Sequence, residues 1–216
     1  MKWRFEKICL LETLFLEIMS PEQILSHPPK VLSQELREDY FELGYVKVEG
    51  LIPKNTLVEL RRMIDKVLDA SREETQSGKI FDLGSGHSPQ KPVLRRLKKP
   101  DEYDQVFWDF ASGLIADVAS DIAGPDVVFH HSKLNFKWND GSDEVKFYQD
   151  AQFFPHTNYN VFTIGCYLND TGLEDGPLAV MPGSHQGELY NLSLIHISEP
   201  TRLLSIAYAG VCVEKK

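Results

Sequence analysis

The residues with the clearest potential for chemistry lie in one short run that contains Tyr148, Asp150, His156 and Asn158. Side chains two apart in a β-strand share a face, so Tyr148 and Asp150 point the same way and could chelate one metal ion. A phenol with a pKa of about 10 is neutral at pH 7, and it is a poor metal donor where an imidazole is a good one. His156 and Asn158 fit two interpretations, the lining of a substrate pocket or local turn hydrogen bonds.

Other polar residues near this run fit structural roles better. His130 and His131 are adjacent, so on a strand they would face opposite sides and could not both reach one metal ion. Gln149 points away from the face that Tyr148 and Asp150 share. Gly183 suits a Pro-Gly turn, and we expect His185 to be a turn or surface histidine.

The elements that must position these residues begin with helices. Ser20 can cap a helix that Pro21 starts and that Gln23 supports through a capping box. Residues 33–43 form a second predicted helix, which Gly44 ends in a left-handed conformation. Further predictions are a strand at 45–49, a long helix capped by Asn55 with apolar residues 57, 60, 64, 67 and 68 on one face, and a helix or helix pair at 103–122.

Residues 77–100 are rich in Gly, Pro, Ser and Lys, and they are predicted to form a long loop of the kind that often serves as a lid. This segment contains the basic run 95–99. One interpretation of the run is a solvated surface. The other is a clamp for an anionic substrate group, such as a phosphate or a CoA tail.

Strand-like runs follow the helices, and turn residues separate them. Helices first and antiparallel strands after predict an α+β or mainly β fold. The expected strands are 127–138, 145–154, 161–168 and 177–181.

Composition narrows the class of protein. The 216 residues are 42% hydrophobic, which is enough for one domain with its own core. The 23 basic and 32 acidic residues give a net charge of -9, which argues against nucleic-acid and anionic-membrane partners. Three scattered cysteines and the lack of an apolar run of transmembrane length favour a reducing, cytoplasmic location. The oligomeric state cannot be predicted from the sequence.

Both ends of the chain differ in character from the middle. Residues 192–202, which read LSLIHISEPTR, resemble the translation of a transposase adapter used in preparing sequencing libraries. We therefore expect 192–216 to be an adapter-derived artefact. Met19 is a suitable initiator, so 1–18 is expected to be an N-terminal extension, which leaves 19–191 as the domain.

Three segments together carry a specific resemblance. Residues 148–158 read YQDAQFFPHTN, residues 173–185 read LEDGPLAVMPGSH, and residues 40–48 read YFELGYVKV. With these segments, most of 33–191 resembles the phytanoyl-CoA dioxygenase family of Fe(II)/2-oxoglutarate oxygenases. The resemblance implies a double-stranded β-helix, the cupin-like jelly roll, after the N-terminal helices.

The resemblance also implies a ligand set. The family holds Fe(II) by a His-X-Asp pair and a distal His, and an Arg further on binds the 2-oxoglutarate carboxylate. Asp150 would then be a metal ligand, with Tyr148 at the position of the expected His. Lys137 matches a family lysine that faces 2-oxoglutarate, and a solvent-facing strand lysine is the alternative. Two His and one carboxylate leave open positions for 2-oxoglutarate and O₂.

The sequence departs from this pattern in two ways. Tyr148 replaces the His, and the distal His and Arg would lie beyond His185. His196 and Arg202 are no substitutes, because they belong to the adapter-like tail. We expect a truncated domain from a dioxygenase that hydroxylates a small organic substrate, inactive as written. The alternative is a non-catalytic small-molecule binding module on the same jelly roll.

Overall fold

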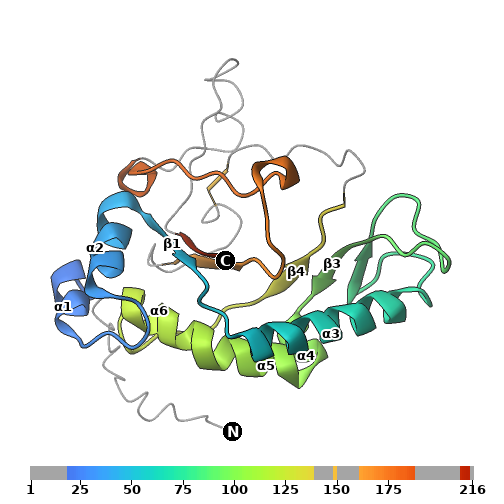
Figure 1. Ribbon diagram of the computed structural model, residues 1–216, viewed down its shortest axis with the longest axis horizontal. Helices are drawn as coiled ribbons and strands as arrows, with labels where there is room; N and C mark the ends of the chain where they lie inside the picture. Colours follow the sequence, from blue (N-terminus) through green and yellow to red (C-terminus); the bar gives the residue numbers. More distant parts are fainter. Residues whose placement is uncertain (1–18, 139–147, 150–160, 188–209, 215–216) are drawn as a thin grey trace, which may run out of the picture.

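The computed structural model describes residues 19–138, 148–149, 161–187 and 210–214. Helices from two parts of the chain form one layer, and the strands lie above it (Figure 1). The described residues therefore form an α+β fold, as predicted. The jelly roll is a finer prediction, which the described strands do not by themselves decide.

The N-terminal helices follow their capping signals closely. Helix α1 spans Pro21–Ser26, and Ser20 and Gln23 form the predicted capping box. Helix α2 spans Gln34–Leu43, with the Ser33 side chain accepting from the backbone N–H of Leu36. Gly44 ends α2 in the left-handed conformation, with φ 81°. Both helix predictions are confirmed, because each rests on local hydrogen bonds that the sequence specifies.

Strand β1 (Tyr45–Glu49) and helix α3 (Lys54–Ser71) come next. The predicted cap of α3 is wrong, since Pro53 occupies the N-cap position and no side chain caps the helix. Proline suits the start of a helix because its missing N–H would lack an intrahelical partner there. Leu57, Leu60 and Val67 are buried, so the predicted apolar face is confirmed.

The predicted long loop at 77–100 is also wrong. It contains strand β2 (Phe81–Leu83) and strand β3 (Leu94–Lys98), which pair antiparallel. The buried side chains of Phe81, Leu94 and Leu97 pack beneath this hairpin. Tertiary burial of these apolar residues outweighs the loop-like composition around them. The basic run 95–99 lies largely on β3 and not in a loop.

The predicted helix at 103–122 corresponds to three consecutive helical pieces, and a fourth, shorter helix ends just before them at Tyr103. Gly113, with φ -95° and ψ -106°, kinks the π-helical piece, and Gly124 follows the last piece as its C-cap. Glycine tolerates such a backbone conformation because it has no Cβ. The shorter helix is α4 (Pro100–Tyr103), and the three pieces are α5 (Gln105–Phe110), η1 (Ala111–Ile115) and α6 (Ala116–Ala123).

The strands among the described residues form two three-stranded sheets. In the first, β2, β3 and β4 (Lys133–Asn135) are antiparallel. In the second, β6 (Gly210–Glu214) pairs in parallel with both β1 and β5 (Thr163–Cys166). The parallel pairing differs from the antiparallel strands that we expected. Strand β6 falls within 192–216, and the artefact origin of that segment stays a prediction.

Of the four strands predicted after the helices, two form only in part, one does not form, and one lies mostly outside the described residues. The run 127–138 forms a strand only at 133–135, and 161–168 only at 163–166. The run 177–181 forms no strand, and it lies between the short 3₁₀ helices η3 (Leu173–Asp175) and η4 (Ser184–Gln186). Most of 145–154 lies outside the described residues.

A buried polar pair joins the N-terminal segment to α6. The Asp121 carboxylate accepts backbone N–H bonds from Lys30 at 2.7 Å, Val31 at 2.7 Å and Leu32 at 2.8 Å. The buried Arg37 donates to the Asp121 carbonyl oxygen at 2.8 Å and to the Ile24 carbonyl oxygen at 2.5 Å. These bonds fix α1 and α2 against the helical layer. No helix among the described residues is long and apolar enough to cross a membrane.

Candidate functional site

The predicted metal pair is only partly within the described residues. Tyr148 is half-buried, and Gln149 is fully buried, which suits its predicted structural role. Asp150, His156 and Asn158 lie outside the described residues, so their roles stay predictions. Within the described ranges, no group of three or more His, Cys, Asp or Glu residues could hold a metal ion. A neutral phenol at position 148 does not fit the imidazole place of an Fe(II) site.

Lys137 lies just after β4, where exposed and half-buried residues alternate along 133–138. Its Nζ donates to the Gly176 carbonyl oxygen at 2.5 Å. Gly176 has φ 61°, and a Cβ at that position would collide with the Lys137 ammonium group. The lysine therefore anchors the turn that follows η3. Its predicted contact with 2-oxoglutarate is not tested by this geometry.

The Pro-Gly-Ser-His segment docks onto the end of α2. The Gly183 N–H donates to the Leu43 carbonyl oxygen at 2.7 Å, and Gly183 has φ 75°. The His185 Nε2 donates to the Phe41 carbonyl oxygen at 3.1 Å, and its buried Nδ1 has no hydrogen-bond partner within the part of the chain that the structure describes. The turn prediction for Gly183 and His185 is confirmed, but His185 is partly buried and not a surface histidine.

Gly44 is the residue that makes this docking possible. A Cβ at position 44 would collide with the His185 ring. The sequence showed Gly44 only as a helix terminator, and its second role as the seat of His185 was missed. The signal that could have found it is the presence of YFELGY and PGSH in the same family pattern.

The two adjacent histidines lie outside the strand on which they were expected, and their predicted structural role is not contradicted. His130 and His131 precede β4 and are not on a strand, so the alternation rule does not apply to them. Their rings lie 4.8 Å apart between centroids, and the two Nδ1 atoms are 2.6 Å apart. No metal site follows from this, because the described residues provide no third ligand there.

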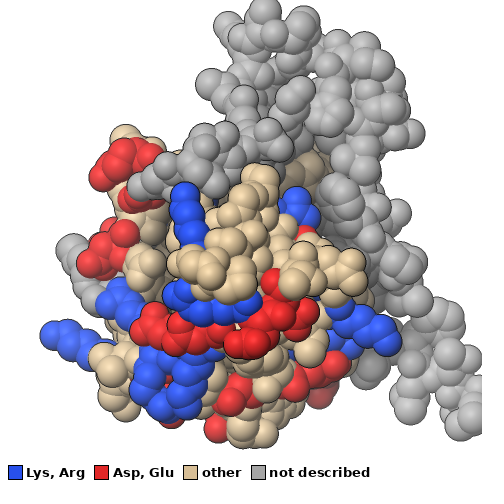
Figure 2. Space-filling model, turned by 90° about the vertical axis from the view of Figure 1, so that its right-hand side faces the viewer, with Lys and Arg blue, Asp and Glu red and all other residues tan. Residues whose placement is uncertain are grey.

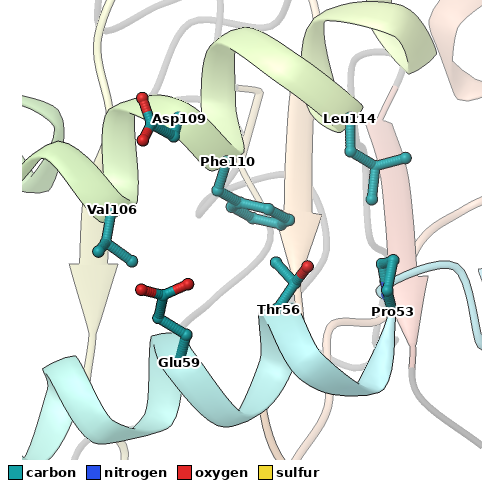
Figure 3. Close-up of a pocket in the computed structure, with 7 residues that line it drawn as sticks. All are labelled: Pro53, Thr56, Glu59, Val106, Asp109, Phe110 and Leu114. Atoms are coloured by element: carbon teal, nitrogen blue, oxygen red, sulfur yellow. The ribbon is translucent and has the colours of Figure 1, made fainter.

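A groove of about 270 Å³ lies between α3 and the α5–η1 segment (Figure 3). The Phe110 ring points across it toward Thr56, and the carboxylates of Glu59 and Asp109 lie at one end. Gln105 donates to the Asp109 carboxylate at 2.7 Å. The groove belongs to the helical layer, and none of the predicted site residues lines it. The lining residues are Pro53, Thr56, Glu59, Val106, Asp109, Phe110 and Leu114.

A comparison with known protein families identifies the family of this chain. The family model described as Phytanoyl-CoA dioxygenase (PhyH) matches residues 40–195. That range includes β1, the run 148–158 and the docked Pro-Gly-Ser-His segment. The chain therefore belongs to the phytanoyl-CoA dioxygenase family.

Individual relatives agree with this family. The "Probable alpha-ketoglutarate-dependent hypophosphite dioxygenase" of Stutzerimonas stutzeri is 27% identical over 158 residues, 73% of this chain and 55% of that protein. The ectoine dioxygenase of Sphingopyxis alaskensis is 25% identical, covering 66% of this chain and 46% of the relative. The human peroxisomal phytanoyl-CoA dioxygenase is 21% identical, covering 74% and 49%.

The chain thus spans about half the length of the curated relatives that it matches. No solved structure matches this chain.

Proposed function

We propose that this chain derives from a non-haem Fe(II)/2-oxoglutarate-dependent dioxygenase that hydroxylates a small organic substrate. The main observation that supports this proposal is the family match over 40–195, which contains the run from Tyr148 to Asn158. The relative named as alpha-ketoglutarate-dependent, which 73% of this chain matches, supports the same co-substrate. A jelly roll completed by residues outside the described ranges is part of this proposal.

The proposal gives each residue a role. Asp150 supplies one carboxylate ligand, and Tyr148 stands where an imidazole is needed. Lys137 faces the co-substrate, and His156 and Asn158 line the substrate pocket. When bound, Fe(II) and 2-oxoglutarate would supply the oxidising chemistry that activates O₂.

As written, the chain is proposed to be inactive. A neutral phenol binds Fe(II) poorly, so Tyr148 leaves the metal without its first imidazole. A tyrosine side chain acts as an anionic ligand only after it loses its proton, and the ordinary tyrosine pKa of about 10 disfavours that loss at pH 7. The second candidate function, a binding module without metal, rests on this same residue. Such a binding module would keep the substrate pocket but would not oxidise the molecule that it binds.

Succinate formation from 2-oxoglutarate tests the inactivity. The whole chain is incubated with Fe(II), ascorbate, 2-oxoglutarate and O₂, and succinate is measured against a protein-free control. We expect no succinate above that control, because the Tyr148 phenol does not hold the metal. Succinate that requires both the chain and iron would show that the chain is an active enzyme, and the inactivity proposal would then be abandoned.

A further inference from the structure

The β2–β3–β4 sheet has one face that packs against the helical layer and one face that carries polar and charged side chains. Leu97 and its cross-strand partner Leu134 pack against the core that includes Leu60 of α3. Neighbouring pairs alternate between faces in an antiparallel ladder, so the flanking pairs point away from the helices. We call this the open face, and its residues are Asp82, Arg96, Lys98, Lys133 and Asn135.

Asp82, Arg96 and Asn135 lie side by side across the three strands. Arg96 does not pair with the carboxylate beside it, because Arg95 donates to the Asp82 Oδ2 at 2.7 Å and 3.1 Å. The Arg96 Nε donates instead to the Asn135 side-chain oxygen at 3.1 Å. The terminal N–H groups of Arg96 have no protein acceptor among the described residues, and the bond from Nε to Asn135 holds the guanidinium in place.

The electrostatics of Asp82 agree with this arrangement. Burial alone would raise the pKa of its carboxyl group, but the hydrogen bond from Arg95 and the charges of Arg95, Arg96 and Lys98 lower it below the usual value. The Asp82 side chain is 13% exposed and that of Arg95 is 65% exposed. The one carboxylate on the open face therefore stays ionised and is already committed to Arg95.

The next pair along the ladder places two cations opposite each other. Lys98 and Lys133 are direct cross-strand partners. Like charges directly opposite each other destabilise a sheet. The Lys98 Nζ donates to the Gly78 carbonyl oxygen at 2.9 Å, whereas the Lys133 side chain has no hydrogen bond or ion pair to another described residue. A bound anion would relieve this repulsion.

We propose that the open face binds a small oxyanion group of the substrate, with Arg96 as the principal donor and Lys98 and Lys133 beside it. The inference rests on the proposed function, since it names the substrate class of that oxygenase. A guanidinium recognises carboxylate, phosphonate or phosphate groups through paired N–H donors. Asn135, which holds Arg96, lies two residues before Lys137, about 7 Å at the rise of an extended chain, so substrate and co-substrate can be neighbours.

The size of the cationic group favours a small anion over a polymer. On the end of the molecule seen in Figure 2, described Lys and Arg side chains are interleaved with Asp and Glu. A nucleic acid needs a continuous basic surface, because its phosphates repeat along the whole strand. The open face offers one row of cations instead, within a chain whose net charge is -9.

Isothermal titration of the whole chain with inorganic phosphate tests the site, without iron or 2-oxoglutarate present. We expect Arg96→Gln to weaken phosphate binding by about tenfold, the loss of one charge-assisted donor pair. Lys133→Gln should weaken it by about threefold. Arg62→Gln is the matched control, because Arg62 is exposed on α3 and the substitution removes the same charge.

Several results would overturn the site. These are phosphate binding unchanged in both open-face variants, an equal loss in Arg62→Gln, or no binding by the unaltered chain. If Arg96→Gln unfolds, as judged by circular dichroism, the exposed Lys133→Gln variant decides. A parallel loss of 2-oxoglutarate affinity in Arg96→Gln would assign the face to the co-substrate and also overturn the proposal. Phosphate binding could depend on Arg96 while the chain stays inactive even after its iron site is restored. That combination would support the anion site and count against the oxygenase proposal alone.

Discussion

Replacing Asp121 with alanine is expected to lower the free energy of unfolding by about 3–5 kcal/mol. The substitution removes the acceptor of the backbone N–H groups of Lys30, Val31 and Leu32. Asp121 is 2% exposed, so water cannot fully replace the lost oxygens. Each buried donor left without a partner costs about 1–3 kcal/mol. Urea unfolding followed by circular dichroism measures the change.

Asp117→Ala is the matched control for this prediction. Asp117 lies on the same helix, α6, and its side chain is 48% exposed in an ion pair with Lys30. Exposed pairs contribute about 0–1 kcal/mol, so this variant should unfold close to the unaltered chain. Equal losses in the two variants would show that the buried carboxylate has no special role in joining the N-terminal segment to α6.

Replacing Gly44 with alanine is expected to cost about 3 kcal/mol or more. Its φ of 81° is left-handed, which costs a non-glycine residue about 1–2 kcal/mol. The added Cβ would also collide with the His185 ring, whose Nε2 is held by the Phe41 carbonyl oxygen. Relieving the collision requires the Pro-Gly-Ser-His segment to leave its seat on α2.

Gly50→Ala separates the two contributions. Gly50 also has a left-handed φ, 68°, but a Cβ there meets nothing within 4 Å. This control should lose only the backbone contribution of about 1–2 kcal/mol. Adding His185→Ala to Gly44→Ala should recover part of the difference, since the colliding ring is removed. Equal melting temperatures for Gly44→Ala and Gly50→Ala would refute the docking of His185 on Gly44.

Local signals in the sequence predict the first two helices of the fold well. The caps at Ser20 and Ser33 and the terminator Gly44 act through hydrogen bonds within a few residues. The hairpin of β2 and β3 could not be predicted in this way. Its strands form because Phe81, Leu94 and Leu97 pack into a core to which helices distant in the sequence contribute. The Gly, Pro, Ser and Lys residues around these three make the segment resemble a loop, so composition alone does not predict the strands.

The candidate site shows the same division. The family resemblance follows from short strings of residues, and the match over 40–195 confirms it. Long-range contacts, such as the Arg37 bond to Asp121 and the His185 ring against Gly44, join residues more than eighty positions apart. No periodicity or spacing encodes such pairs. The arrangement of Arg95 and Arg96 around Asp82 likewise depends on strand register, which the predicted loop excluded.

The central claim is that Tyr148 occupies the place of an iron-binding histidine, and iron content tests it most directly. The whole chain and its Tyr148→His and Tyr148→Phe variants are loaded with Fe(II) without oxygen, desalted and measured for iron per chain. We predict that Tyr148→His binds Fe(II) about tenfold more tightly or better, because even partners outside the first ligand shell change metal affinity by that much. The unaltered chain and Tyr148→Phe should both retain little iron. Stoichiometric iron in the unaltered chain, lost in Tyr148→Phe, would contradict the account and make the phenol itself a ligand.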